Sequence, residues 1–290
     1  MTNHITVGFD GSPEAQEALR WGAGEAVKRA CELEIMHCYH LPVASDVQGG
    51  WVPMEAYSGV EKAAGAHLQH AEDVINDDYP ELPVSTALRT GPAWTCLVED
   101  PVGHQELIVV GASSHQGPSA FWLGSTPRAL VRHADCPVVV VRGVSGRGGP
   151  DRVVVGTDGS EASDQALRWA AAEADLHQVG LHVVHAWEYP YLTVTTGESQ
   201  ARDVMHVDAA LVLEQALAVA RETCGSTVTG DLVEDGPASG VLGAVRDGDL
   251  LVLGSRGRGG LRAGIFGSTV NSVLDRAAIP VVVVRGQPER

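Results

Sequence analysis

Pro137-Val138-Val139-Val140-Val141-Arg142-Gly143 occurs twice in this chain, because Pro280-Val281-Val282-Val283-Val284-Arg285-Gly286 repeats it without a change. Four consecutive valines make both faces of an extended strand apolar. An antiparallel sheet with one face in water does not need such a strand, whereas a parallel sheet covered by helices on both faces does. The segment therefore predicts a parallel sheet of an α/β protein, present in two copies.

The duplication extends over nearly the whole chain. Gly8-Phe9-Asp10-Gly11-Ser12 returns as Gly156-Thr157-Asp158-Gly159-Ser160 at an offset of 148 residues, and Gly124-Ser125-Thr126 returns as Gly267-Ser268-Thr269 at an offset of 143. Order and spacing are thus conserved between the copies. A chain of 290 residues is also long enough for two ordinary domains.

The boundary falls in residues 144–150, a glycine-rich stretch without apolar periodicity. We place the first domain at residues 1–143 and the second at residues 150–290. Each copy alternates five short β-branched runs with helical patterns, which predicts two tandem doubly wound five-stranded parallel sheets. The expected strands are residues 5–9, 34–39, 84–89, 107–111 and 138–142, then 153–157, 181–187, 227–233, 250–254 and 281–285.

Composition excludes several classes of protein. With 37 acidic residues against 20 Lys and Arg, the net charge is −17, so no general affinity for nucleic acid or anionic membranes is expected. The five cysteines form no C-x-x-C pair, which indicates a reduced compartment. Because no run of 18 apolar residues and no cationic leader occurs, we expect a cytoplasmic protein.

The edge of the sheet where a ligand would bind carries unusual residues. Open α/β sheets bind ligands at the carboxyl ends of their strands, where the winding reverses. The first strand ends at Asp10 or Asp158, and the fourth ends at Gly111 or Gly254 before a long glycine-rich loop. Glycines let a ligand approach the backbone, and the free N–H groups of the helix that opens at residues 267–269 favour an anion.

Acidic residues are also missing from this edge. None occurs from residue 250 to residue 274, a segment that contains Arg256, Arg258 and Arg262, and the first copy has a similar gap from residue 107 to residue 134. These features predict phosphate binding in both copies. Walker A and strand-following G-x-G-x-x-G motifs are absent, which argues against P-loop and NAD-binding domains.

The pattern Gly254-x2-Gly257-x9-Gly267-Ser268, with V-G-x-D-G-S in the first strand and P-V-V-V-V in the last, resembles the ATP-binding class of the universal stress protein family. The likeness covers nearly the whole chain, once per copy. It implies an adenine nucleotide α-hydrolase-like fold and a cytosolic, ATP-binding regulator of stress or growth arrest. It also implies domains that pair through their last strands.

The resemblance further implies a set of nucleotide contacts in each copy. In the second copy they are Asp158, Ala186, Leu253, Gly254, Gly257, Gly267, Ser268 and Thr269, with Arg256 and Arg258 as charge neutralisers. In the first copy they are Asp10, Cys38, Val110, Gly111, Gly124, Ser125 and Thr126. Asp158 is in addition the expected ligand of a nucleotide-bound Mg²⁺.

The first copy departs from the motif, because Ser114 stands where the second copy has Gly257. If that position needs a left-handed backbone, serine costs about 1–2 kcal/mol there, and its Cβ would intrude on the phosphate path. Ser113 and His115 also replace the two arginines of the second copy. We therefore expect weaker nucleotide binding in the first copy.

Several alternatives stay open. Asp10 and Asp158 could bind Mg²⁺, accept from a ribose, or only cap the first turn. Cys38 could be redox-active in the site, but a small buried hydrophobe is the preferred interpretation. His37 and His185 could pack beside the nucleotide, but a bond to a backbone group is preferred. For the whole chain, a nucleotide-binding regulator competes with a slow Mg-dependent ATPase and with a flavin-binding protein, which would be yellow. The apolar last strands predict pairing between the copies, and a homodimer is also expected.

Overall fold

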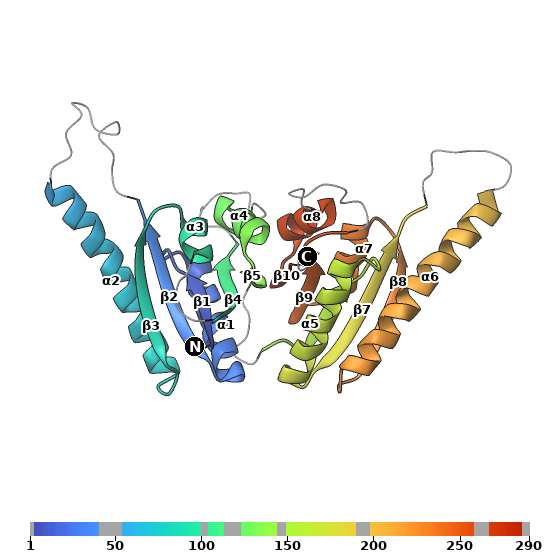
Figure 1. The fold of residues 1–290 in the computed structure, drawn as a ribbon, viewed down its shortest axis with the longest axis horizontal. Coiled ribbons are helices and arrows are strands. Elements are labelled where there is room, and N and C mark those ends of the chain that lie inside the picture. The colour runs from blue at the N-terminus through green and yellow to red at the C-terminus, as the bar shows by residue number, and fades with distance from the viewer. Residues whose placement is uncertain are drawn as a thin grey trace, which may run out of the picture. The chain divides into compact units, whose positions relative to one another are not determined.

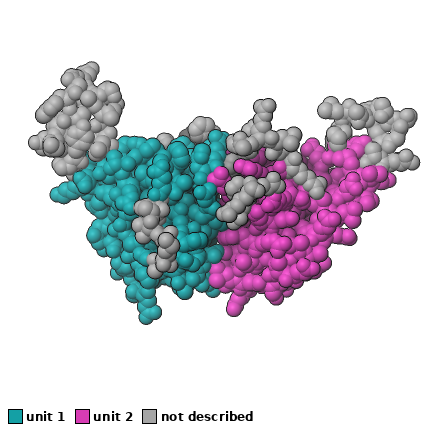
Figure 2. All heavy atoms as spheres, in the orientation of Figure 1, with its two compact units in different colours: residues 1–147 teal, residues 148–290 magenta. Residues whose placement is uncertain are grey.

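The structure, a computed structural model, describes residues 3–40, 54–99, 104–112, 123–143, 149–189, 198–257 and 267–285. The chain divides into two compact units, Met1–Arg147 and Gly148–Arg290 (Figure 2). Each unit is a helix-covered parallel sheet (Figure 1). The α/β fold with parallel sheets that the sequence predicts is therefore confirmed.

Unit 1 contains five strands and four helices among its described residues. In chain order they are β1 Asn3–Gly8, α1 Pro13–Arg29, β2 Glu32–Tyr39, α2 Met54–Asp78, β3 Val84–Thr90, α3 Ala93–Val98, β4 His104–Gly111, α4 Ser125–His133 and β5 Val138–Val141. The strands lie in the order β3-β2-β1-β4-β5, and all of their pairings are parallel. The winding therefore reverses between β1 and β4.

Unit 2 repeats this arrangement. Its elements are β6 Arg152–Gly156, α5 Glu161–His177, β7 Gly180–Trp187, α6 Glu198–Thr223, β8 Val228–Glu234, α7 Pro237–Ala244, β9 Asp249–Gly254, α8 Ser268–Arg276 and β10 Val281–Val284. The strand order is β8-β7-β6-β9-β10, again with parallel pairings only. The reversal here lies between β6 and β9.

Helices cover each sheet in two layers. In unit 1, α1 packs on β1 and β4 and contacts α2, while α3 contacts α4. The strands between them are apolar on both faces, and Ile5, Val7, Ile108 and Val109 are completely buried. This explains why the strands of the sequence appear as continuous apolar runs. No helix in the described part of the chain is long and apolar enough to cross a membrane.

Serine caps fix the start of the first helix in each unit. The Ser12 hydroxyl accepts a hydrogen bond from Ala15 N at 3.2 Å, and Ser160 accepts one from Ser163 N at 3.3 Å. Each of these helices therefore begins directly after a serine that caps it. The glycine before each cap has a left-handed backbone, with φ of 82° at Gly11 and 72° at Gly159, so the Asp-Gly-Ser turn depends on that residue.

Candidate functional site

A hollow opens in unit 1 at the carboxyl ends of β1, β2 and β4, where the winding reverses. We name it the unit-1 hollow. It is lined by Gly8, Phe9, Asp10, Ser12, Ala15, Met36, Cys38, Ala93, Leu97, Val110, Gly111, Gly124, Ser125, Thr126 and Pro127. All seven residues that the sequence nominates in the first copy are in this set, so the structure brings them together around one space.

The sequence reasoning missed the apolar wall of this hollow. Phe9, Met36 and Leu97 supply it, and each is at least 96% buried. Leu97 comes from α3, a helix of only 6 residues that the sequence pattern does not single out. The sequence did contain one signal for this wall. Met36 and Cys38 are two residues apart in β2, so their side chains lie on the same face of the sheet.

Asp10 lies in the turn between β1 and α1. Its Oδ1 accepts hydrogen bonds from Ser12 N at 3.0 Å and from the Ser12 hydroxyl at 2.6 Å. In unit 2, Oδ1 of Asp158 accepts from Ser160 N at 3.0 Å. Asp10 and Asp158 therefore both cap the first turn, which is one of the alternatives that the sequence leaves open. In each carboxylate, Oδ1 accepts the hydrogen bonds of the turn.

The histidines beside the site bond to the backbone, as predicted. Nδ1 of His37 lies 2.7 Å from Phe9 O, and Nδ1 of His185 lies 2.7 Å from Thr157 O. These bonds fix the first two strands of each sheet to one another at their carboxyl ends. The His37 ring also meets His67 of α2 edge-on, with centroids 5.8 Å apart.

The glycine that ends the fourth strand has a packing role. An ideal Cβ on Gly111 would lie 2.8 Å from Glu14 O, and one on Gly254 would lie 2.6 Å from Ala162 O. Real Cβ atoms do not approach backbone oxygens this closely, so the first turn of α1 or α5 excludes any side chain here. The recurrence of these glycines is explained by the protein itself, before any ligand is considered.

The second glycine of the motif lies beside a side chain that the sequence did not suggest. The backbone of Gly257 is not left-handed, so the expected strain of a serine at that position does not arise from φ. Instead, an ideal Cβ on Gly257 would lie 2.5 Å from Asp158 Oδ2. The glycine leaves space for the Asp158 carboxylate. Ser114, its counterpart in the first copy, lies outside the described residues.

The helices that open the phosphate end of each site have uncapped N-termini. Gly124 and Gly267 are the N-caps of α4 and α8, and neither helix has a side-chain cap or an acid in its first turn. Their first N–H groups thus point toward the strand ends without an intrahelical partner. The two helices differ at the third position, where Pro127 has no N–H and Val270 has one.

Unit 2 has more hydroxyls at the base of its site than unit 1. The Thr157 and Ser163 hydroxyls lie 3.2 Å apart and are buried, where unit 1 has Phe9 and Ala15. Ser255, which follows Gly254, is 2% exposed, and its hydroxyl has no hydrogen-bond partner among the described residues. The two sites are therefore not chemically equivalent.

The remaining sequence-predicted residues of unit 2 lie at the ends of its strands and at the start of α8. Leu253 and Gly254 end β9, which pairs with β6, the strand that Asp158 follows. Gly267, Ser268 and Thr269 start α8, and an ideal Cβ on Gly267 would lie 4.0 Å from Ser255 O. Ala186 lies near the end of β7, and Arg256 is exposed. Arg258 lies outside the described residues.

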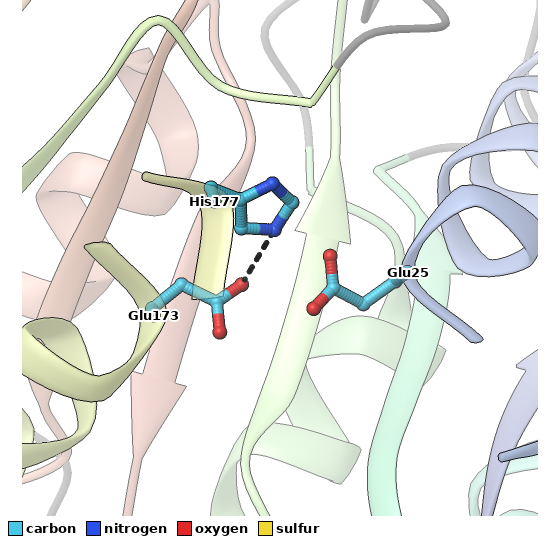
Figure 3. A group of neighbouring side chains, drawn as sticks. All are labelled: Glu25, Glu173 and His177. Atoms are coloured by element: carbon cyan, nitrogen blue, oxygen red, sulfur yellow. Dashed lines mark ion pairs between the residues drawn. The ribbon is translucent and has the colours of Figure 1, made fainter. Parts of the chain in front are cut away.

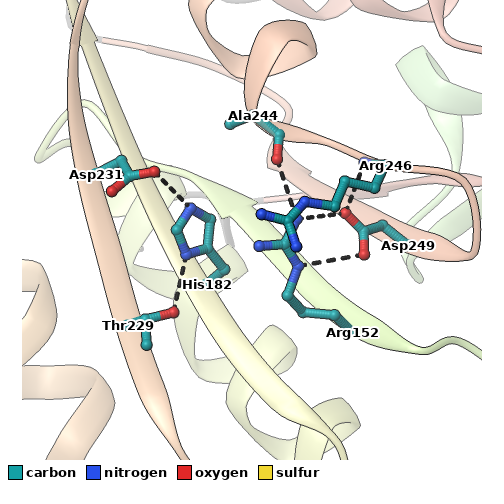
Figure 4. Close-up of polar contacts among 7 residues, drawn as sticks. All are labelled: Arg152, His182, Thr229, Asp231, Ala244, Arg246 and Asp249. Atoms are coloured by element: carbon teal, nitrogen blue, oxygen red, sulfur yellow. Dashed lines mark hydrogen bonds and ion pairs between the residues drawn. The ribbon is translucent and has the colours of Figure 1, made fainter.

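The amino ends of the strands in unit 2 carry a separate polar cluster (Figure 4). Arg152 donates to both oxygens of the buried Asp249, at 3.2 and 2.6 Å. His182 of β7 lies between Thr229, at 2.9 Å, and Asp231, at 3.3 Å. Burial, followed by the charge of Arg152, lowers the pKa of His182. This cluster lies at the opposite end of the sheet from the candidate site.

Two ion pairs on the first helices also lie outside the candidate site. His177 and Glu173, one turn apart on α5, are 3.4 Å apart (Figure 3). In unit 1, Arg29 and Glu25 are one turn apart on α1 at 2.8 Å. Both are i, i+4 pairs, which stabilise helices. Neither contributes a residue to the strand ends.

Comparison with known proteins decides the family. The family model described as the universal stress protein family matches residues 1–142 and again residues 150–285. The chain belongs to the universal stress protein family. Universal stress protein Rv2623 of Mycobacterium tuberculosis is 32% identical over 301 residues, which cover 97% of this chain and 96% of that protein. A universal stress protein of Mycolicibacterium smegmatis is 32% identical over 291 residues, with the same coverage.

Solved structures agree on the fold of this universal stress protein. A universal stress protein from Archaeoglobus fulgidus matches with a TM-score of 0.70 at 19% identity, over 98% of this chain and 99% of that one. The functionally unknown protein PA1789 from Pseudomonas aeruginosa matches with a TM-score of 0.64 at 17% identity, over 98% and 93% of the two chains. Both similarities concern the fold, and both extend over two domains' length.

Proposed function

We propose that this universal stress protein binds ATP at the carboxyl ends of its strands and acts as a nucleotide-dependent regulator. One observation carries the proposal: the seven residues that the family motif nominates in the first copy all line the unit-1 hollow. They come from four separate elements of the fold. The apolar wall of that hollow suits a base, and the uncapped helix at its other side suits phosphates.

Unit 2 is the proposed higher-affinity site. Gly257 leaves room for the Asp158 carboxylate, and α8 offers an N–H at Val270 where α4 has Pro127. Asp158 is the proposed ligand of Mg²⁺ on the nucleotide, because it follows β6 at the edge of the sheet where the winding reverses. One carboxylate suits Mg²⁺ bound to ATP, since phosphate oxygens and waters complete its coordination.

Calorimetric titration of the full chain with MgATP tests this proposal. In the Ser268→Asp variant, a carboxylate at the N-terminus of α8 repels phosphates, so we expect the affinity of unit 2 for ATP to fall about tenfold or more. The same charge stabilises the helix itself, so a loss of binding cannot be attributed to unfolding. Ser272→Asp, one turn further along α8, is the matched control. Equal affinity in Ser268→Asp and the control would refute the phosphate site.

The competing ATPase function is tested by turnover. Hydrolysis needs a positioned base for water. Asp10 is the only carboxylate among the described residues that line the unit-1 hollow, and its Oδ1 already accepts two hydrogen bonds. We therefore propose binding without rapid hydrolysis. Multiple turnovers of labelled ATP that disappear in Asp158→Ala would show that the protein is an enzyme, and a yellow preparation would indicate a flavin.

The assembly and the compartment are also proposals. β5 and β10 are the outermost strands in the order of their own sheets, and each consists of four valines. We propose that the two units pair through these strands, that the chain forms a homodimer, and that it functions in the cytoplasm. Cysteines introduced at Val140 and Val283 should crosslink within one chain if the strands pair, and light scattering gives the oligomeric state.

A further inference from the structure

Two cysteines meet at the wall of the unit-1 hollow. Cys38 lies near the end of β2, and Cys96 lies in α3, which begins 3 residues earlier at Ala93. Cys96 is near enough to Cys38 to raise the pKa of that thiol, and Cys38 Sγ lies 3.8 Å from Ala93 O, in the first turn of the same helix. Both side chains are partly exposed. Cys38 is therefore not simply the small buried hydrophobe that the sequence suggested.

The counterparts of Cys38 and Cys96 in unit 2 show independently how closely these two positions of the fold approach each other. The N-caps of α3 and α7 are Pro92 and Gly236, which makes Gly240 the counterpart of Cys96. Ala186 is the counterpart of Cys38. An ideal Cβ on Gly240 would lie 2.7 Å from the Ala186 Cβ.

The two units have different residues at these positions. In unit 2 the close approach is possible because Gly240 has no side chain. Unit 1 has a thiol at both positions. Disulfides require Cβ atoms about 3.5–4.5 Å apart. In unit 2 the Cβ atoms at the two positions would be nearer than this, so the equivalent positions of unit 1 are within the reach of a disulfide.

We propose that Cys38 and Cys96 are a thiol modification site that forms a reversible disulfide with hydrogen peroxide as the oxidant. The thiolate of one of the two cysteines attacks one peroxide oxygen, the O–O bond breaks, and a sulfenic acid and one water form. The sulfur of the other cysteine then displaces the hydroxyl group, the S–S bond forms, and a second water leaves. The two thiols lose two electrons and two protons in total, and the peroxide accepts them. A low-molecular-weight thiol reverses the reaction by disulfide exchange.

The surroundings of Cys38 disfavour its thiolate. Burial, and then the neighbouring Cys96, raise the pKa of Cys38 to about 12, so this thiol keeps its proton near neutral pH. Only thiolates react readily with peroxide, so we expect the oxidation to be slow at neutral pH.

The bond would change the unit-1 hollow, because Cys38 lines it together with Ala93 and Leu97 on either side of Cys96. A disulfide ties α3 to β2 and draws the two walls together. We expect lower affinity of unit 1 for ATP in the oxidised protein, a consequence that rests on the proposed function. The disulfide itself does not depend on it.

Peptide mapping of the full chain tests the modification. The protein is treated with hydrogen peroxide, its free thiols are alkylated, and non-reducing digests are analysed by mass spectrometry. We expect a linked pair of peptides that contain Cys38 and Cys96, which dithiothreitol separates. Cys38→Ala and Cys96→Ala should each abolish that pair, and Cys136→Ala should retain it. Separate alkylation of Cys38 and Cys96 after peroxide treatment would overturn the proposal.

A second measurement separates this inference from the proposed function. ATP titrations are compared for the reduced and the oxidised protein, with Cys96→Ala as the variant that cannot respond to peroxide. A disulfide without ATP binding to unit 1 in the reduced protein would refute the proposed function in that unit and leave the modification site standing. ATP binding without a disulfide would refute the modification site alone.

Discussion

An ideal Cβ on Gly257 lies 2.5 Å from Oδ2 of Asp158, so a side chain at position 257 would require the Asp158 carboxylate to shift. These two residues are 99 positions apart in the sequence, and the parallel pairing of β6 with β9 brings them together. The contact ties the second glycine of the motif to the acidic residue of the first strand. Changing either residue should therefore affect the other.

Gly257→Ser tests this contact directly. The serine side chain must displace the Asp158 carboxylate, so we expect the affinity of unit 2 for MgATP to fall about tenfold or more, which corresponds to about 1.4 kcal/mol. Isothermal titration measures the change. Gly243→Ser on α7, where an added Cβ meets nothing within 4 Å, should bind as the unchanged protein does. If both variants bind ATP equally well, the contact has no role in binding.

Gly254→Ala should destabilise unit 2 whether or not a ligand binds there. The new methyl group would lie 2.6 Å from Ala162 O, and the displacement of α5 that relieves this overlap costs about 1–3 kcal/mol. Thermal denaturation should show a melting temperature lower by about 2–4 °C for each kcal/mol. Gly243→Ala serves as the control. An unchanged melting temperature in Gly254→Ala would mean that this glycine is free to carry a side chain.

Arg152→Met should destabilise unit 2 by about 3 kcal/mol, because it leaves the Asp249 carboxylate buried without its cation. Asp249 is 4% exposed and otherwise accepts a hydrogen bond from Arg246 N at 2.8 Å. Urea denaturation measures the loss. Adding Asp249→Asn to Arg152→Met removes the buried charge and should recover much of the stability. A double variant as unstable as the single one would contradict this account.

The His182 site predicts a pH dependence of stability. Burial and Arg152 lower its pKa below the ordinary value of 6.5, so the unfolded chain binds the proton at a higher pH than the folded chain does. The free energy of unfolding is therefore fully retained above pH 6.5 and falls as the pH drops through 6.5 toward the pKa of the folded state.

His182→Gln keeps a polar group near Thr229 but cannot take up this proton. Denaturation of this variant in urea at a series of pH values from about 8 to about 5 should show a weaker decline than the unchanged protein does. His70→Gln, at an exposed position of α2, is the control and should decline as the unchanged protein does. Identical pH profiles for His182→Gln and the unchanged protein would rule out His182 as the group responsible.

The strands could be predicted from the sequence because their pattern occurs in it twice. Apolar runs such as Val138–Val141 and their repeats identify the strands, and the Asp-Gly-Ser turn identifies the helix starts. The offset between the copies was less reliable within short helices. The repeated Gly-Pro-Ala suggests an offset of 145 residues around α3, whereas the helix N-caps Pro92 and Gly236 differ by 144.

The steric contacts of the site residues were harder to predict from the sequence than their positions in the chain. The sequence indicates that Gly254 and Gly257 matter, but their steric neighbours, Ala162 and Asp158, are distant in the chain. Cys96 was missed because its partner is 58 positions away. The second copy gives no further signal, because none of the cysteines of the first copy recurs in it.

Pro127 and Val270 give the two helix starts unequal numbers of donors for the same anion. If each start holds a nucleotide, the chain fills its tighter site first and its weaker site only when the nucleotide is more abundant. Such a protein would give a graded response across a broad concentration range, where two matched sites would saturate together.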